Sequence, residues 1–193
     1  MDTKDIKVDV AADLHQMAIK ELIPEHTVSA DEMKLHVSSS GWELNGDGNF
    51  DDIPVKLSMN EKFADKQYKS KCHLSFKLDD KAKKVLGIDW KVLNAPNLEG
   101  YALVNADVVV QDDHAVKIDL NADLSQTKMG YAYLGLVKEV GENAEIKAKV
   151  NMKDNKITSV SNMSLIKSGF TINGNIAAYA SGRVKTVDIT KIS

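Results

Sequence analysis

The sequence predicts a mostly β fold, an antiparallel meander with one or two short helices. Apolar and polar residues alternate strictly along most of the chain, as they do in strands with one buried and one solvent-exposed face. These segments recur about every 10 to 14 residues and are joined by short turns rich in Asp, Asn and Gly. Because the predicted helices are too few to cover such a sheet, either two sheets cover each other or one curved sheet folds around its own apolar face.

Length and composition define the class of protein. With 193 residues, of which 27% are charged and 43% hydrophobic, the chain is expected to form one β-domain over residues 1–193. The net charge of -3 argues against a nucleic-acid partner, which usually requires a basic surface. Cys72 is the only cysteine, so no internal disulfide can form. No apolar run approaches the roughly 18 residues that a membrane-spanning helix needs.

The first half of the chain already shows the alternation. A strand is predicted over 6–10, whereas 14–22 fits a helix or a strand. Two later strands each place four apolar residues on one face: Ile53, Val55, Leu57 and Met59, then Cys72, Leu74, Phe76 and Leu78. The run 46–52, rich in Gly, Asp and Asn, is expected to turn the chain, because glycine adopts positive φ and Asp and Asn side chains bond to nearby backbone.

One short helix is predicted over 79–87. Asp79 stands at the N-cap position, good helix formers follow it, and Gly87 ends the helix. The lysines at 81, 83 and 84 are expected to form its solvent-exposed face. Residues 61–69 are a weaker candidate for a further helical turn.

The alternation is clearest in the second half of the chain. Strands are predicted over 98–111, 116–124, 145–153, 157–166, 170–176 and 184–189. Small residues share the apolar face with the larger ones, and they would leave room for a guest molecule: Gly100, Ala102, Ala106, Ala122 and Ala148.

No residue pattern predicts catalysis or metal binding. Asn45, Asp47 and Asn49 alternate as calcium ligands do, but Phe50 stands where a calcium loop requires glycine. The five histidines lie in separate segments without ligand spacing. Cys72 is expected to pack as a small hydrophobic residue, and the paired Asp119 and Asp123 to be solvated. We therefore expect neither an enzyme nor a cofactor.

Several turn-and-strand units share a common pattern. They are Gly46-Asp-Gly-Asn-Phe50 with Ile53-Pro54 and Asn60-Glu61-Lys-Phe63, Ile118-Asp-Leu120 with Lys138-Glu-Val-Gly141, Gly169-Phe-Thr-Ile-Asn-Gly174, and the Asp-capped helix ending in Leu86-Gly87. In order and spacing they resemble the AsmA-like family of bacterial envelope proteins, of the YhdP/TamB type, over residues 27–190. One departure is Glu142, which follows Gly141 where the family commonly has proline.

The resemblance implies both a shape and a function. Such proteins are similar to bridge-like lipid-transfer proteins: they are anchored in the inner membrane of Gram-negative bacteria and extend through the periplasm as a curved, taco-like or half-open sheet. The groove shields phospholipid acyl chains on their way to the outer membrane, without catalysis or a cofactor. The chain is then expected to be a central segment of a longer protein, with Met1 an added start and the membrane anchor elsewhere. An unpaired terminal strand would favour an edge-strand dimer as an artefact of truncation.

The expected lipid-contacting surface is the apolar face of the second-half strands. Acyl chains need a continuous apolar surface, since each methylene shielded from water contributes about 0.8 kcal/mol. This surface is predicted to comprise Val104, Val108, Ile118, Leu120, Ile146, Val150, Phe170 and Ile172. The same residues are equally suited to the filled core of a closed structural or adhesive envelope domain, and the sequence leaves both alternatives open.

Overall fold

The computed structural model describes residues 7–20, 26–64, 70–88, 93–111, 115–132, 135–154, 156–179 and 183–192. Within them a large sheet comprises β1 (Asp9–Lys20), β2 (Thr27–Ser38), β3 (Gly41–Phe50), β4 (Ile53–Lys62), β5 (Ser70–Leu78), β7 (Ala102–Val110), β8 (Ala115–Asp123), β11 (Ala144–Lys153), β12 (Lys156–Lys167), β13 (Phe170–Ala178) and β14 (Val184–Ile192). A small sheet comprises β6 (Leu98–Gly100), β9 (Thr127–Tyr131) and β10 (Leu136–Lys138), and the helix is α1 (Asp80–Val85).

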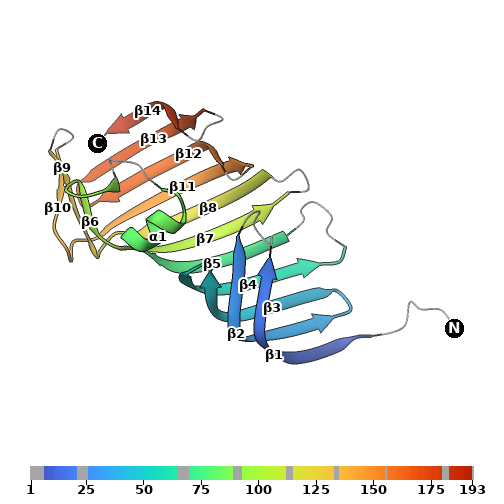
Figure 1. Cartoon of the computed structure of the whole chain (residues 1–193). Helices are drawn as coiled ribbons and strands as arrows, with labels where there is room; N and C mark the ends of the chain where they lie inside the picture. Colours follow the sequence, from blue (N-terminus) through green and yellow to red (C-terminus); the bar gives the residue numbers. More distant parts are fainter. Residues whose placement is uncertain are drawn as a thin grey trace.

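The large sheet is an antiparallel meander of 11 strands, ordered β1-β2-β3-β4-β5-β7-β8-β11-β12-β13-β14 (Figure 1). Each strand pairs with the strand that follows it in the large sheet. Between β5 and β7 the chain forms α1 and β6, and between β8 and β11 it forms β9 and β10. The sheet is curved, and among the described strands β1 and β14 form its two edges. The prediction of a mostly β, curved antiparallel meander with a short helix is therefore confirmed.

The N-terminal strands bend sharply along their length (Figure 1). β2 has one more residue than β3 between the pairs Ser29–Asn49 and Lys34–Asn45, which is a β-bulge. In β1, Gln16 has a positive φ of 52°. Extra residues and irregular φ angles increase the local coiling of a sheet. These features fold the first strands towards their own apolar face.

The Gly-rich run at 46–52 lies at this bend, and the prediction that it turns the chain is correct for Asp51 and Asp52 but wrong for residues 46–50. Residues 46–50 are the end of β3, and only Asp51 and Asp52 turn the chain. A Cβ on Gly48 would lie 2.5 Å from the carbonyl oxygen of Ser29 in β2. The glycines therefore serve a close approach of two strands and not a reversal of the chain.

Gly48→Ala should therefore lower the free energy of unfolding by about 2 kcal/mol, since the Ser29 backbone must shift to admit a methyl group. Gly130→Ala is the matched control, because Gly130 is also in a strand but has room for a methyl group. A Cβ on Gly130 would lie 3.6 Å from the Pro96 carbonyl oxygen, which is an ordinary van der Waals contact. Urea denaturation measures both variants. Equal stability losses would contradict the role assigned to Gly48.

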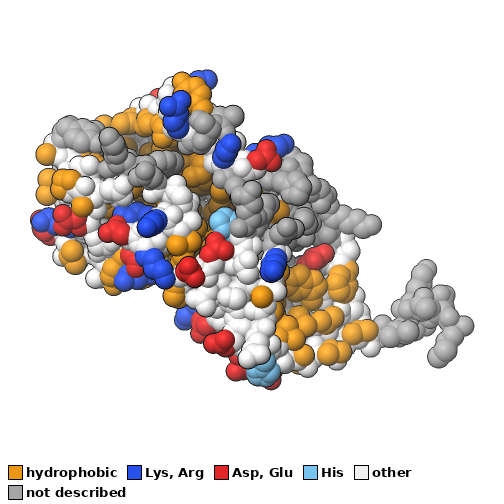
Figure 2. Space-filling view, in the orientation of Figure 1, with side chains coloured by type: hydrophobic (Ala, Val, Ile, Leu, Met, Phe, Trp, Pro, Cys, Tyr) orange, Lys and Arg blue, Asp and Glu red, His pale blue; other side chains and the backbone are white. Residues whose placement is uncertain are grey.

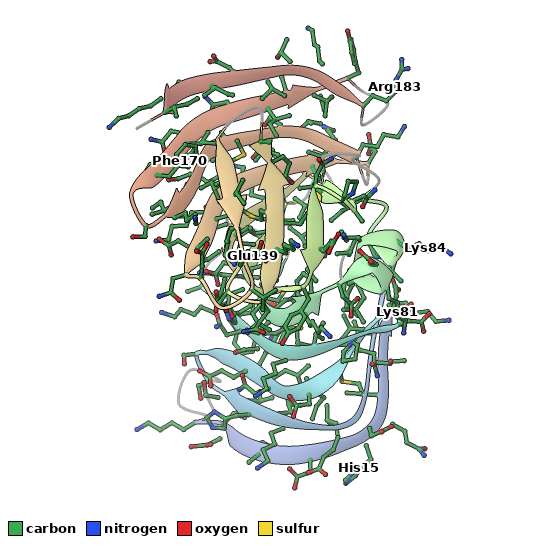
Figure 3. All side chains as sticks on the ribbon, turned by 90° about the vertical axis from the view of Figure 1, so that its left-hand side faces the viewer. His15, Lys81, Lys84, Glu139, Phe170 and Arg183 are labelled. Atoms are coloured by element: carbon green, nitrogen blue, oxygen red, sulfur yellow. The ribbon has the colours of Figure 1, made fainter. Side chains whose placement is uncertain are left out.

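The predicted helix is present, with one correction to its surface. Asp79 caps α1, and its Oδ1 accepts a hydrogen bond from the Ala82 backbone N–H at 3.0 Å. Lys81 and Lys84 are exposed and point outward (Figure 3). The expectation that Lys83 is solvent-exposed is wrong, because its Nζ is buried 2.6 Å from Asp80 Oδ1 and 2.8 Å from the Leu93 carbonyl oxygen.

The sequence predicts one continuous strand over 98–111, and this prediction fails at Gly100. Gly100 has a φ of 90°, so the chain bends there and separates β6 from β7. β6 then pairs with β9, and β9 with β10. Gly100 is thus an exposed residue of the small sheet and does not belong to the apolar face of β7.

The small sheet lies across one end of the large sheet (Figure 3). Met129 and Leu136 from its strands belong to the same buried apolar cluster as Val104 and Leu165 of the large sheet. Lys167 of β12 also donates a hydrogen bond to the Val137 carbonyl oxygen of β10 at 2.7 Å. The small sheet therefore covers part of the apolar face. The alternation of the sequence predicts neither β9 nor β10.

A second buried cluster fills the curve of the N-terminal half. It joins apolar residues of β2, β3, β4, β5, β7 and β8, and it includes Ala82 of α1. Val28, Met33 and Val108 in this cluster are each less than 3% exposed. The N-terminal half thus encloses its own apolar side chains.

Candidate apolar binding face

The register of the large sheet places the predicted lipid-contacting residues on one face. Residues paired directly across neighbouring strands point to the same side of a sheet. One row of such pairs runs through Val104, Ala122, Ile146, Leu165 and Ile172. A parallel row runs through Val108, Ile118, Val150, Val160 and Ile176. Leu120, between these rows, and Phe170, beside the first, complete the predicted set.

The predicted residues differ in how far the protein covers them. Val104, Val108 and Ile172 are buried, whereas the other five are half-buried: Ile118, Leu120, Ile146, Val150 and Phe170. Among the small residues, Ala102, Ala106 and Ala122 are also buried, so the space beside them is occupied by the protein itself. Only Ala148 is half-buried. The face is therefore filled over β5 and β7 and less covered towards β11–β13.

Exposure is greatest on β14, the last strand. Val187 pairs with Ile176 of β13, which in turn pairs with Val160 of β12. The side chain of Val187 is 56% exposed. Two register shifts in the β13–β14 ladder keep four apolar residues of β14 opposite the apolar face of β13. We name the part of the face that is half-buried or exposed the C-terminal apolar face. It consists of the half-buried Ala148, Val150, Met163, Ile176 and Ala178 and the exposed Val184, Val187, Ile189 and Ile192. Val160, which lies between Val150 and Ile176, is itself buried. Figure 2 shows apolar side chains near β14, and others over the N-terminal strands.

A polar hollow lies over β2 and β3, beside Gly46 and Gly48. It has a volume of about 490 Å³ and is lined by polar and charged groups that include Asp31, Glu32, Lys34 and Asp47. Among the described residues, no group of three or more His, Cys, Asp or Glu side chains is arranged to hold a metal ion. Nor does any described helix have the length and apolarity needed to cross a membrane.

Three polar side chains on the opposite face have the connectivity of a Ser–His–Asp triad. His73 Nδ1 lies 2.9 Å from Asp107 Oδ1, and Ser75 Oγ lies 3.3 Å from His73 Nε2. However, Ser75 donates its proton to Asn105 Oδ1 at 2.6 Å, away from the histidine. The site is on an exposed sheet surface, where backbone N–H groups are engaged in the β5–β7 ladder. This arrangement lacks the activated hydroxyl and the oxyanion donors that acyl transfer requires.

Histidine–aspartate pairs are features that sequence reasoning missed. His36 Nε2 lies 2.8 Å from Asp9 Oδ1, which links β1 to β2. His26 Nδ1 lies 2.7 Å from Asp51 Oδ2 and stacks against Phe50. Partial burial raises the pKa of Asp51, but hydrogen bonds from His26 and from the Thr27 N–H outweigh it and hold the pKa below its usual value. The first pair connects β1 to β2, whereas the second joins the residue before β2 to the turn after β3. The sequence pattern does not indicate either pair.

Cys72 packs as the sequence predicts. Its side chain is buried opposite Val108. Burial, together with the negative charge of Asp107, raises the pKa of the Cys72 thiol to about 12. The thiol therefore stays protonated and unreactive at neutral pH.

Comparisons of the chain with protein-family models, with curated proteins and with solved structures found no match. The function must therefore be inferred from the residues and their geometry.

Proposed function

We propose that the chain is a segment of a periplasmic AsmA-like envelope protein whose curved sheet shields phospholipid acyl chains between the inner and outer membranes. The observation that carries this proposal is the C-terminal apolar face, whose residues are half-buried on β11–β13 and exposed on β14. The family and the periplasmic location rest on the sequence resemblance.

The chemistry of the C-terminal apolar face suits an acyl chain. Its residues are aliphatic or Met, and Val184, Val187, Ile189 and Ile192 are each at least 39% exposed. An acyl chain laid along them would remove apolar surface from water on both partners, at about 25 cal/mol per Å². It would need no polar partner, and the face offers none. The proposal narrows the predicted surface, since buried Val104, Val108 and Ile172 cannot contact a guest without unfolding.

The alternative is a structural or adhesive envelope domain with a filled core. The buried clusters of the N-terminal half and beneath the small sheet support this alternative in those regions. Neither cluster includes a residue of the C-terminal apolar face. The two functions therefore differ in what contacts β13 and β14 in the cell.

Site-specific photo-crosslinking separates these alternatives. A benzophenone side chain placed at Val187 faces the apolar side, whereas one placed at the neighbouring Asp188 faces the other side; both positions are exposed. With the protein in phosphatidylethanolamine–phosphatidylglycerol vesicles, we expect phospholipid adducts at 187 at least about tenfold above those at 188, because acyl chains partition to the apolar side. Mass spectrometry identifies the adducts. Equal or absent adducts at both positions would favour the filled structural domain.

A further inference from the structure

The small sheet is folded over the apolar face of the large one. Among the described residues, no strand of either sheet pairs with a strand of the other. Side chains hold the two together instead: Met129 and Leu136 of the small sheet, each 2% exposed, pack in the same cluster as Leu165 and Ile172 of the large sheet. Figure 3 shows the small sheet lying across the ends of the large-sheet strands. It therefore covers apolar surface with apolar side chains of its own.

The covered surface continues directly into the C-terminal apolar face. On β11, Ile146 packs against the covered cluster, and Ala148 is the next residue on the same face of the strand. On β12, the buried Leu165 has the half-buried Met163 beside it on that face. The border of the small sheet therefore marks where the apolar face passes from covered to accessible.

The connections between the two sheets are bonded to one another. The backbone N–H of Tyr101, after β6, donates to the Gln126 carbonyl oxygen before β9 at 3.3 Å. The N–H of Gly141, after β10, donates to the Ser125 carbonyl oxygen at 2.9 Å. Gly100 and Gly141 have φ angles of 90° and 92°, which favour glycine. Short connections of this kind absorb the backbone rotation of a hinge, so the three connections form one hinge line.

A lysine of the large sheet fastens the small sheet in place. Lys167 Nζ donates to the Val137 carbonyl oxygen of β10 at 2.7 Å and lies 3.1 Å from Glu142 Oε2, in the connection after β10. The Lys167 side chain is 20% exposed, so water can reach this contact and replace its partners. Lys138 differs, because its Nζ bonds to carbonyl oxygens of the small sheet and its own connections. Lys138 therefore holds the small sheet together as one body, and Lys167 latches that body to the large sheet.

We propose that the small sheet is a flap that opens about this hinge line and lets a phospholipid acyl chain lie on the apolar surface beneath it. The ligand rests on the proposed function; the hinge does not. Opening is a local event that separates side-chain contacts and leaves the ladder of the large sheet intact. An acyl chain supplies the same aliphatic contacts that Met129 and Leu136 give up, and it reaches this surface only in the open state. Lipid therefore shifts the flap towards the open state, and buried residues such as Ile172 meet lipid only through this opening.

Thiol labelling measures opening without any lipid. Ala122→Cys places a thiol in the cluster beneath the flap, and Ala106→Cys places one in the cluster of the N-terminal half; each alanine is 4% exposed. Adding Lys167→Met should raise the labelling rate at 122 at least about fivefold, the effect of one lost hydrogen bond, and leave the rate at 106 unchanged. Lys147→Met is the matched control, since the ion pair of Lys147 lies within β11. Peptide mapping separates these thiols from Cys72.

Two results of this labelling would overturn the flap. One is an equal change at 122 from both lysine substitutions, and the other is an equal acceleration at 122 and 106. Either result would mean that the thiol under the small sheet is exposed by opening of the whole protein.

A locked flap tests the ligand. Val137→Cys and Lys167→Cys, joined by a short bismaleimide, should hold the flap closed, because these two residues are in contact. A benzophenone side chain in place of Phe170, which packs against the covered cluster, reports lipid in phosphatidylethanolamine–phosphatidylglycerol vesicles. Joining should lower phospholipid adducts at 170 at least about tenfold relative to the same protein capped with a monofunctional maleimide, because only the open state binds lipid there. Adducts at a benzophenone placed at 187 in a parallel preparation should not change.

The two positions separate failure of the flap from failure of the proposed function. Adducts at 187 together with none at 170, or with equal adducts at 170 before and after joining, would overturn the flap and leave the function standing. No adducts at 187 would overturn the function and the lipid ligand together, while the labelling rates at 122 still report whether the flap opens.

Discussion

Val108→Asp is expected to unfold the protein at neutral pH. Val108 is 2% exposed, and its cross-strand neighbours on the apolar face are Cys72 and Ile118. A carboxylate there would be buried between apolar groups, and a buried charge of this kind costs several kcal/mol. We expect a loss of at least about 4 kcal/mol, which is close to the lower end of the roughly 5 to 15 kcal/mol that stabilises a typical domain. Urea denaturation and far-UV circular dichroism measure the loss.

Val109→Asp is the matched control for this substitution. Val109 is the next residue of β7, points to the opposite face, and lies between Lys71 and Lys117 on the neighbouring strands. A carboxylate there would be partly exposed beside two cations, so the stability should change by less than about 1 kcal/mol. If both aspartates destabilise the protein equally, the packing assigned to Val108 is wrong.

A third aspartate separates the packed part of the apolar face from the uncovered part. Val187→Asp introduces the same charge on the same face, but at a position that is 56% exposed. The protein should stay folded, and phospholipid adducts at a benzophenone placed at the neighbouring Ile189, on the same face, should fall because the charge disfavours acyl chains. We therefore expect Val108→Asp to unfold the protein and Val187→Asp to remove only the lipid contact. This difference is expected because Val108 is buried and Val187 is exposed.

The sequence is sufficient to predict the fold class because the apolar alternation in most long strands is local. In β7 and β8, for example, Val104, Val108 and Ile118 occupy alternate positions, so their common face follows from the period of a strand. The cap of α1 is equally local, since Asp79 lies within one turn of the N–H group that it accepts from. Features set by neighbouring residues are therefore predictable.

Features that depend on distant segments are not predictable in this way. Gly48 reads as a turn residue by composition, but the nearby carbonyl of Ser29 makes it part of a bent strand. The small sheet comes from strands too short to show alternation. The sequence predicts a strand over 184–189, but it does not show the register shifts that place Val184 and Ile192 of β14 on one face.

The candidate site follows the same division. The sequence identifies the face on which the predicted residues lie, but coverage of that face depends on the curvature of β1–β4 and on the position of the small sheet. Val108 and Val187 are alike by residue type, and both face the apolar side of the sheet. The first is enclosed by the bent N-terminal half, and the second lies on an edge strand of the described sheet.

The second large effect is expected at Lys138, whose side chain is fully buried at 0% exposure. Its Nζ donates to the carbonyl oxygens of Thr127 at 2.7 Å, Glu139 at 3.0 Å and Ser125 at 3.5 Å. The ammonium group thus joins β10 to the start of β9 and to the turn before it. Lys138→Met keeps most of the side-chain volume but leaves these carbonyls without their donor. We expect a loss of about 2 to 4 kcal/mol at pH 7, measured by urea denaturation.

The pH dependence of this loss gives a test that is specific to the charge. Burial lowers the pKa of Lys138, partly offset by the negative charge of Glu142. In the unfolded chain the pKa returns to about 10.5, so between the folded pKa and 10.5 the unfolded state binds more protons. Stability contributed by Lys138 should therefore rise as pH increases through that window, and the advantage of the wild type over Lys138→Met should be larger at pH 10 than at pH 7. If the stability difference between the wild type and Lys138→Met decreases as the pH rises, the pKa of Lys138 is raised in the folded protein and not lowered. The folded protein would then stabilise the charged form of the lysine relative to the unfolded chain.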